Sequence, residues 1–191
     1  AVARGETTIV GGVDSYHHPD VLAALAEDLR LLSETAHAGL VPSEAAAFVV
    51  VGPRGSSRVR AKVITAAAGV EAEKTWEEPR VAELLTELVR RVAPTLGERP
   101  LRWILSDVNG ERQRQKERDY LGFRTRDLID PTETVETHLA RETGDLGAAT
   151  GAFAAAYVVQ GYETGFAPAE KALVMTSSHG DARGVFALGA P

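Results

Sequence analysis

Apolar residues follow two different spacings along this chain. In several segments they recur every three or four positions, which is the period of a helix that buries one face. The predicted helices span 19–32, 78–92, a more polar segment 113–120, and a small-residue segment that begins at Thr143 or Asp145 and ends near Gly161. Pro19 suits the first turn of a helix, because the N–H that proline lacks has no partner there.

Short continuous apolar runs, several of them rich in β-branched residues, predict strands. These runs span 7–10, 45–51, 61–69, 101–105, 171–175 and 184–188. We expect the first to be a buried strand that ends at a Gly11–Gly12 turn, and the last two to form a hairpin. A further turn is expected at 53–57. Because strands alternate with helices and several are apolar throughout, the pattern indicates an α/β layer fold.

Composition narrows the possible function classes. The chain has 191 residues, enough for one domain with its own core, and a net charge of −6, which gives no basic footprint for nucleic acid. No apolar run reaches the roughly 18 residues of a membrane span and no secretory signal is visible, so we expect a cytoplasmic protein. The lack of cysteine excludes disulfides, cysteine-based zinc sites and a cysteine nucleophile on this chain.

The segment Gly144–Gly151 is the most distinctive part of the sequence. Glycines and alanines surround Asp145, and an apolar run over 152–159 follows. Small residues let two backbones approach closely, which indicates a helix buried on all sides rather than a surface helix. A polar residue at such a helix start faces whatever lies beyond the free N–H groups. Asp145 is therefore either a helix cap or part of a ligand-binding or catalytic site.

Three motifs, in order, resemble the middle of a β-ketoacyl-(acyl carrier protein) synthase. They are Arg4-Gly5-Glu6, then Ile9 to Ser15, then Gly39 to Ala47, and the order of the later elements is also similar. The resemblance implies a thiolase-like layered α/β fold, with a mixed five-stranded sheet and helices, of which this chain holds an incomplete C-terminal portion. It places the end of the N-terminal half in 1–58 and the C-terminal half in 59–191.

The departures from this family fall on its catalytic positions. The family's cysteine nucleophile would lie before Ala1, so we expect a fragment, a processed product or a trimmed chain. Of the family's two histidines, one corresponds to Asp107 or Asn109, depending on the register, and the other corresponds to Asp145. A glycine-rich loop that borders the family's active site is replaced by 178–181, which contains His179. The candidate site residues are thus Asp107, Asn109, Asp145 and His179.

The exchange of histidine for aspartate has a direct chemical consequence. Decarboxylative condensation needs neutral imidazole donors that polarise the thioester carbonyl and stabilise the developing enolate. A carboxylate at Asp145 opposes that negative charge, and the dipole at a helix N-terminus keeps it ionised. Ordinary ketosynthase chemistry is therefore disfavoured in this chain.

Simpler interpretations compete for the remaining histidines. His179, together with Asp181 and Arg183, belongs either to a structural hairpin turn or to a pocket. His138 lies seven residues before Asp145 and is either an exposed loop residue or a second pocket residue.

Other polar and aromatic residues favour structural interpretations. The pair His17–His18 lacks a third ligand at a useful spacing and indicates a surface turn, so no metal site and no cofactor are expected. Glu111 and Glu117 are interpreted as solvated charges, with a general base as the alternative. Trp76 and Trp103 are interpreted as packing residues.

Two function classes remain, and both follow from the resemblance. The first is an atypical β-ketoacyl synthase-like acyltransferase of fatty acid or polyketide biosynthesis, acting on thioesters of acyl carrier protein or coenzyme A and inactive as this chain alone. The second is a non-catalytic subunit, like a chain-length factor, that shapes a pocket or scaffolds an active partner. The expected partner is the missing N-terminal portion, a second thiolase-like chain or a copy of this chain, so a dimer is expected. A hydrolase that uses Asp145 and His179 has no Gly-x-Ser-x-Gly motif to support it.

Overall fold

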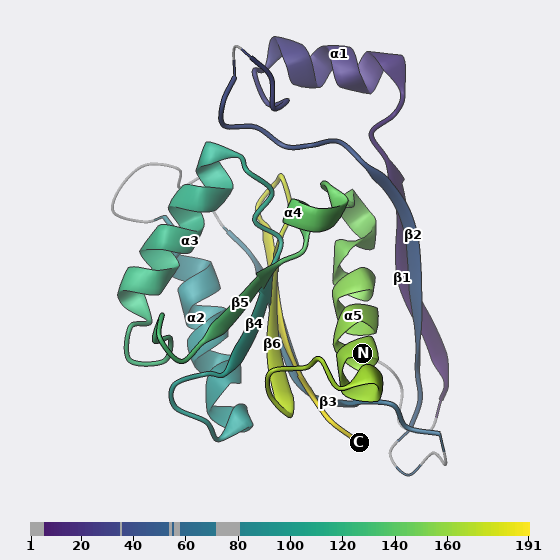
Figure 1. Cartoon of the computed structure of the whole chain (residues 1–191), viewed down its shortest axis with the longest axis vertical. Coiled ribbons are helices and arrows are strands. Elements are labelled where there is room, and N and C mark those ends of the chain that lie inside the picture. The colour runs from purple at the N-terminus through teal and green to yellow at the C-terminus, as the bar shows by residue number, and fades with distance from the viewer. Residues whose placement is uncertain (1–5, 35, 54, 56–57, 72–80) are drawn as a thin grey trace.

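A computed structural model describes residues 6–34, 36–53, 55, 58–71 and 81–191. Within these residues the strands form a two-stranded ribbon and a five-stranded sheet. In the ribbon, β1 (Thr8–Ser15) pairs antiparallel with β2 (Glu44–Val51). Figure 1 shows four layers, in which helices α2 and α3, the sheet, helix α5 and the ribbon follow one another.

The five-stranded sheet is mixed, as the resemblance implied. Its order is β3 (Lys62–Val70), β7 (Ala182–Gly189), β6 (Lys171–Ser177), β4 (Trp103–Ser106) and β5 (Val135–His138). The strand β4 runs parallel to both β5 and β6, whereas β7 runs antiparallel to β3 and β6. The predicted hairpin is confirmed as β6–β7.

Helices cover both faces of this sheet. On one face lie α2 (Glu83–Val92) and α3 (Arg112–Arg124), and on the other lies α5 (Thr150–Thr164). The short α4 (Ala140–Thr143) and the 3₁₀ turn η2 (Gly147–Ala149) lead into α5, and a second 3₁₀ turn, η1 (Ala93–Leu96), follows α2. Helix α1 (Pro19–Glu27) lies between β1 and β2 in sequence, at the end of a projecting arm (Figure 1).

Alternation along the strands divides the core between the two faces. Ile104 of β4 packs in the cluster that contains α2, whereas Trp103 and Leu105 pack in the cluster that contains α5. The small residues of α5 allow this packing, since a Cβ at Gly161 would lie 3.1 Å from the Trp103 ring. Trp103 is therefore a packing residue, as predicted.

Several predicted boundaries were wrong for identifiable reasons. Gly11 and Gly12 form no turn, because β1 continues through them to Ser15 with mostly exposed residues. The Phe48 ring lies across Gly11, where a Cβ would come within 2.3 Å of it, so glycine is needed for close approach rather than for a turn. The alanine-rich helix begins at Thr150, later than the expected start.

The remaining differences are smaller. Helix α1 ends at Glu27 instead of reaching 32, and the polar strand β5 was not predicted. Part of the expected 53–57 turn, the first residues of the 78–92 helix, Trp76 and the motif residues Arg4 and Gly5 lie outside the described residues.

Helix α3 is joined to the sheet mainly by charges. It buries Glu117, whose Oε1 accepts a hydrogen bond from Arg183 Nε at 2.6 Å and whose Oε2 accepts one from Ser177 Oγ at 2.8 Å. Glu117 is only 3% exposed and Arg183 only 2%. Glu117 was interpreted as a solvated charge; instead, it forms a buried ion pair across the β6–β7 hairpin.

Removal of one partner of this pair should be strongly destabilising. We expect Glu117→Ala to lower the free energy of unfolding by about 3–5 kcal/mol, because it removes the carboxylate that lies 2.6 Å from the buried Arg183 guanidinium, whose Nη2 is 3.9 Å from Glu71 Oε2. Urea denaturation followed by circular dichroism measures the loss. The control is Glu87→Ala, which breaks an exposed ion pair with Arg91 on α2 and should cost less than about 1 kcal/mol. Equal effects of the two variants would contradict the assignment.

Candidate functional site

The polar residues singled out in the sequence gather at the carboxyl ends of the parallel strands. The chain leaves β4 through α3 on one face to reach β5, and leaves β5 through α4 and α5 on the other face to reach β6. The connection after β4 and the connection after β5 thus lie on opposite faces of the sheet. This makes the carboxyl-end edge a topological switch point, where open α/β sheets bind ligands. Asp107 and Asn109 directly follow β4 and so lie at this point.

Asn109 is the centre of the hydrogen-bond network at this edge. Its Nδ2 donates to Asp145 Oδ2 at 2.5 Å and to Glu111 Oε2 at 2.9 Å, and its Oδ1 accepts from the backbone N–H of Glu111 at 3.1 Å. Asn109 is only 8% exposed. One amide therefore bridges two carboxylates and satisfies both of its hydrogen-bonding ends.

Asp145 is fixed from three sides. Its Oδ1 accepts from the N–H of Gly147 at 2.8 Å, and its own N–H donates to the carbonyl of Val41 at 2.8 Å. Gly144, just before it, has a φ of +75°, and a Cβ there would lie 2.9 Å from both Ser43 and Val41. Asp145 thus satisfies an N–H of the η2 turn, but it lies five residues before α5 and does not cap that helix.

Tyr16 joins the network from the end of β1. Burial, the charge of Asp145 and a hydrogen bond to the same carboxylate raise the pKa of the Tyr16 phenol. The phenol therefore stays protonated and serves as a second donor toward Asp145.

Arg30 brings the projecting arm onto the site. Helix α1 ends in a Schellman-type turn, with Leu29 at φ 54° and the N–H of Arg30 bonded to the carbonyl of Leu25 at 2.8 Å. Arg30 Nε then donates to Glu111 Oε1 at 2.6 Å. Burial alone would raise the pKa of Glu111, but the hydrogen bonds from Arg30 and Asn109 outweigh it and hold that pKa below its usual value. Glu111 is therefore a fixed counter-ion, not a solvated charge.

His179 lies at the outer rim of the same network. Its Nε2 is 3.3 Å from Arg30 Nη1 and accepts the hydrogen bond, which places the ring proton on Nδ1. Burial and the charge of Arg30 lower the pKa of His179, so the ring is neutral at pH 7. The hairpin residue His179 is therefore part of the site, whereas the Arg183 guanidinium faces Glu117 and Glu71.

The Asp107 carboxylate contacts β6 and α3. Its Oδ2 accepts from the Ser177 N–H at 2.5 Å and lies 3.6 Å from Arg114 Nη1. Burial raises the pKa of Asp107 to about 6, even though Arg114 and the Ser177 N–H favour the charged form.

A small cavity adjoins Asp107 and Asp145. This cavity, lined by Asp107, Gly144, Asp145, Thr150 and neighbouring residues, has a volume of about 10 Å³. This is roughly the space that one water molecule needs.

The structure brings Asn109, Asp145 and His179 into one network and places Asp107 beside it. His138 is not a loop residue, because it ends β5 and faces Ser106. His18 lies at the start of α1, where its Nδ1 accepts from the N–H of Asp20. Among the described residues, no group of three His, Cys, Asp or Glu side chains could hold a metal ion.

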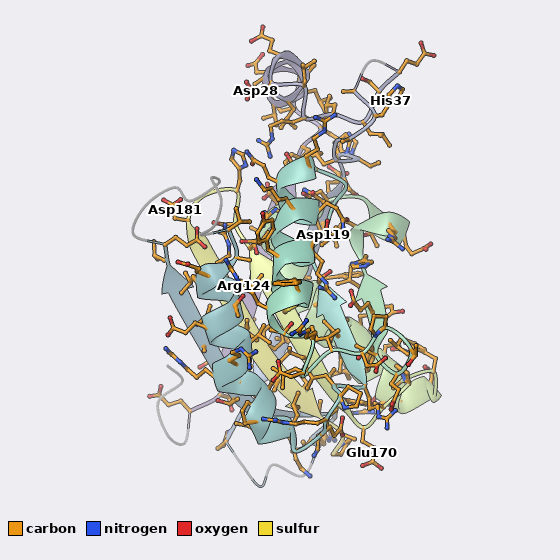
Figure 2. All side chains as sticks on the ribbon, turned by 90° about the vertical axis from the view of Figure 1, so that its left-hand side faces the viewer. Asp28, His37, Asp119, Arg124, Glu170 and Asp181 are labelled. Carbon is orange, nitrogen blue, oxygen red and sulfur yellow. The ribbon has the colours of Figure 1, made fainter. Side chains whose placement is uncertain are left out.

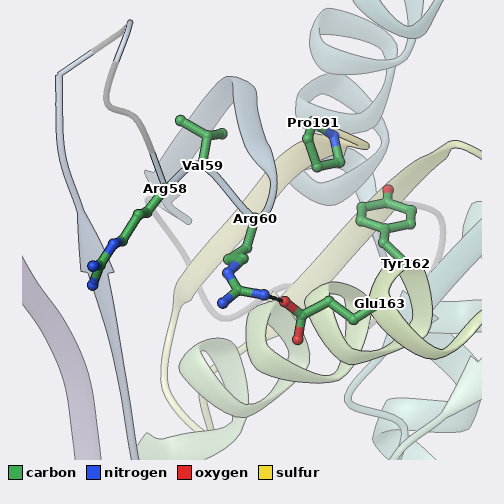
Figure 3. A pocket seen from close by; sticks show the side chains of 6 residues that line it. All are labelled: Arg58, Val59, Arg60, Tyr162, Glu163 and Pro191. Atoms are coloured by element: carbon green, nitrogen blue, oxygen red, sulfur yellow. Dashed lines mark hydrogen bonds and ion pairs between the residues drawn. The ribbon is translucent and has the colours of Figure 1, made fainter.

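Figure 2 shows the side chains of the whole described chain, and Figure 3 shows a hollow away from this network. Asp28 and His37 lie on the projecting arm in Figure 2. A hollow of about 420 Å³ lies at the other end of α5, roughly 20 Å from the α5 start by the helical rise. Figure 3 shows it between Tyr162, Pro191 and the ion pair of Arg60 with Glu163. Its distance from the network separates it from the candidate site.

Asp107 should make stability fall as the pH rises. The folded chain holds the Asp107 proton up to a pKa of about 6, whereas the ordinary value is 3.8, so unfolding releases a proton between these two values. We expect the free energy of unfolding to drop by about 2 kcal/mol over this window, relative to Asp107→Asn. Urea titrations at several pH values measure the difference. The exposed Asp119→Asn variant should keep the pH dependence of the unmodified chain, and a pH profile unchanged by Asp107→Asn would contradict the burial argument.

Asp145→Asn tests whether Asp145 is more than a turn residue. The new amide nitrogen would face the Asn109 amide, which cannot rotate without losing its bond to the Glu111 N–H. We therefore expect a loss of about 1–2 kcal/mol in denaturant unfolding. If Asp145 only satisfied the Gly147 N–H, asparagine would serve equally well and the variant would be neutral.

Comparisons with known proteins give structural but no sequence relatives. Neither a protein-family model nor a curated protein sequence matches the chain.

Within the described part of the chain, no helix is long and apolar enough to cross a membrane.

Three solved structures illustrate the match. The ketosynthase from module 6 of the bacillaene synthase from Bacillus subtilis 168 has a TM-score of 0.78 at 14% identity, over 97% of this chain and 42% of that chain. The ishigamide ketosynthase/chain length factor has 0.79 at 14%, over 97% and 54%. A β-ketoacyl synthase from Burkholderia phymatum STM815 has 0.76 at 13%, over 97% and 55%. The chain thus spans about half the length of these proteins or less, and its fold is that of part of a thiolase-like ketosynthase.

Proposed function

We propose that this chain is a ketosynthase-like subunit that does not itself carry out condensation and that shapes a pocket or scaffolds an active partner. In this role it would resemble a chain-length factor. The fold likeness to ketosynthases and to the ishigamide ketosynthase/chain length factor supports this class. The choice of a non-catalytic role within the class rests on the Asn109–Asp145 network.

The main observation in favour of this proposal is that the hydrogen-bond donors in this network already bind carboxylates. Asn109 donates to Asp145 and Glu111, and Arg30 donates to Glu111. Stabilisation of a developing enolate needs preorganised donors aimed at an open position for the oxyanion. Here an enolate would meet the negative charge of Asp145 instead.

The outward face of the ribbon supports a scaffolding role. Ile9 and Val13 of β1 and Phe48 and Val50 of β2 are exposed, and in the β1–β2 register they lie on the same face. The opposite face of the ribbon packs against α5 and the η2 turn, as the 2.1 Å approach of a Cβ at Gly12 to the Ala148 carbonyl shows. An exposed apolar sheet face of this kind marks an interaction surface.

The partner that we propose is a further thiolase-like portion or chain. In this proposal 1–58 ends an N-terminal half and 59–191 forms the C-terminal half, and the assembly is a cytoplasmic dimer. One structural neighbour is a type II polyketide acyl carrier protein in complex with its ketosynthase, so an acyl carrier protein or coenzyme A thioester is the proposed ligand of the assembly.

Malonyl-thioester decarboxylation tests the non-catalytic assignment. Malonyl-coenzyme A is incubated with the chain, with Asp145→His, and with the double variant Asn109→His/Asp145→His, and acetyl-coenzyme A is measured by mass spectrometry. We expect no product above the protein-free background from the unmodified chain, because decarboxylation needs hydrogen-bond donors that stabilise the enolate and the charge of Asp145 opposes it. Product from the double variant alone would support the argument that the residues at 109 and 145 remove this chemistry. An active ketosynthase assayed in parallel verifies the assay.

Decarboxylation by the unmodified chain would overturn the proposal in favour of an atypical acyltransferase. Native mass spectrometry provides the second readout, because a scaffold should be found with a second chain or as a self-associated species. A clean monomer at 20.3 kDa would count against the scaffolding role.

A further inference from the structure

A second cluster of reactive side chains lies next to the candidate site, on the face of the sheet that α3 covers. Ser106 ends β4 and is paired in register with His138, which ends β5. Ser106 Oγ is 2.7 Å from His138 Nδ1, and His138 Nε2 is 3.7 Å from Glu136 Oε2. A hydroxyl, an imidazole and a carboxylate thus lie in sequence, which is the order of groups in a nucleophile–base–orienter relay.

The carboxylate of this relay is held in place from α3. Arg118 Nε donates to Glu136 Oε2 at 3.0 Å, and its Nη2 contacts Oε1, so the guanidinium binds the carboxylate through both oxygens. Such a two-point contact fixes the plane of the carboxylate. Glu136 is therefore oriented before any ligand arrives.

The protonation state follows from these neighbours. A carboxylate on the Nε2 side favours the proton on Nε2, which leaves Nδ1 free to accept from the Ser106 hydroxyl. Burial and the nearby charge of Arg141 lower the pKa of His138. The imidazole is therefore neutral at pH 7 and can act as a base.

The relay lies at one edge of the five-stranded sheet, because β5 is the edge strand there. Ser106 is 5% exposed, and the side chains of His138 and Glu136 are 13% and 25% exposed. Exposure therefore increases outward from the hydroxyl to the carboxylate. Open α/β sheets bind ligands at the carboxyl ends of their strands, so an electrophile would reach the Ser106 hydroxyl from this edge.

We propose that Ser106 is a nucleophile, activated by His138 and oriented through Glu136, that accepts an acyl group from an activated ester or thioester. Ser106 Oγ attacks the carbonyl carbon while its proton moves to His138 Nδ1. The bond from carbon to the alcohol or thiol leaving group then breaks, and the leaving group takes the proton from His138. Water releases the acid from the serine ester by the reverse proton path. This activity forms no carbon–carbon bond and does not depend on the proposed scaffolding role.

Fluorophosphonate labelling tests this proposal on the unmodified chain. A fluorophosphonate probe forms an Oγ–phosphorus bond with an activated serine and releases fluoride, and peptide mass spectrometry identifies the labelled residue. We expect the label on Ser106, and its rate should fall as the pH drops through a pKa below the ordinary 6.5 of histidine. The labelled residue is identified in the unmodified chain, so this result does not depend on whether any variant folds.

Variants then separate the three roles. Ser106→Ala should abolish labelling, His138→Gln should slow it by about 100-fold, and Glu136→Gln should slow it less. Ser15→Ala is the matched control, since Ser15 Oγ donates to a carboxylate, Glu44, without a histidine, and labelling should be unchanged. Circular dichroism verifies the fold of each variant. No label, or a label at any other serine, would show that the Ser106–His138 bond only joins β4 to β5 and would overturn the proposal.

Discussion

The buried ion pair between Glu117 and Arg183 determines where α3 lies, and the position of α3 determines the rest of the carboxyl-end edge. Helix α3 has little apolar surface to place it, with Leu121 as its one buried apolar side chain within the described residues. Three polar side chains of α3 tie it to four strands: Glu117 contacts β6 and β7, Arg118 contacts β5, and Arg114 lies near Asp107 at the end of β4. Charge pairing gives a direction that apolar packing lacks, because each guanidinium must meet its own carboxylate.

This arrangement links the two clusters at the edge. The loop that contains Asn109 leads into α3. Glu111, the residue just before this helix, accepts a hydrogen bond from Arg30 of the projecting arm. A displacement of α3 would therefore disturb the Asn109 bridge and the Glu136 clamp together. The arm, the loop after β4 and the hairpin are separate in sequence, but one set of ion pairs joins them.

Much of the layer architecture could be predicted from the sequence. Apolar runs predicted the strands of the sheet, apart from β5, because burial on both faces leaves a continuous hydrophobic signal. The strand β5 was missed because Glu136 and His138 are partners of Arg118 and Ser106, and such pairing has no periodic signature. Gly11 was misinterpreted as part of a turn because a glycine under an aromatic ring and a glycine in a turn are identical in sequence.

The candidate site was predictable only in part. Asp107, Asn109, Asp145 and His179 were found through their positions in a resemblance. Tyr16 and Arg30 were missed, because they reach the site through the β1–β2 ribbon and the turn after α1, which only tertiary structure brings together.

In the proposed non-catalytic role, the charge of Asp145 accounts for a ketosynthase-like fold without condensation chemistry. A carboxylate accepts hydrogen bonds only, so its neighbours must be donors, and the amide of Asn109, the phenol of Tyr16 and the N–H of Gly147 fill that role. A neutral imidazole at the same position would offer a donor outward to a ligand. The exchange thus reverses the direction of hydrogen bonding, from donation toward a ligand to acceptance from the protein itself. The packing needs of the Gly144–Gly151 segment are unaffected, which is why fold and activity can separate at this position.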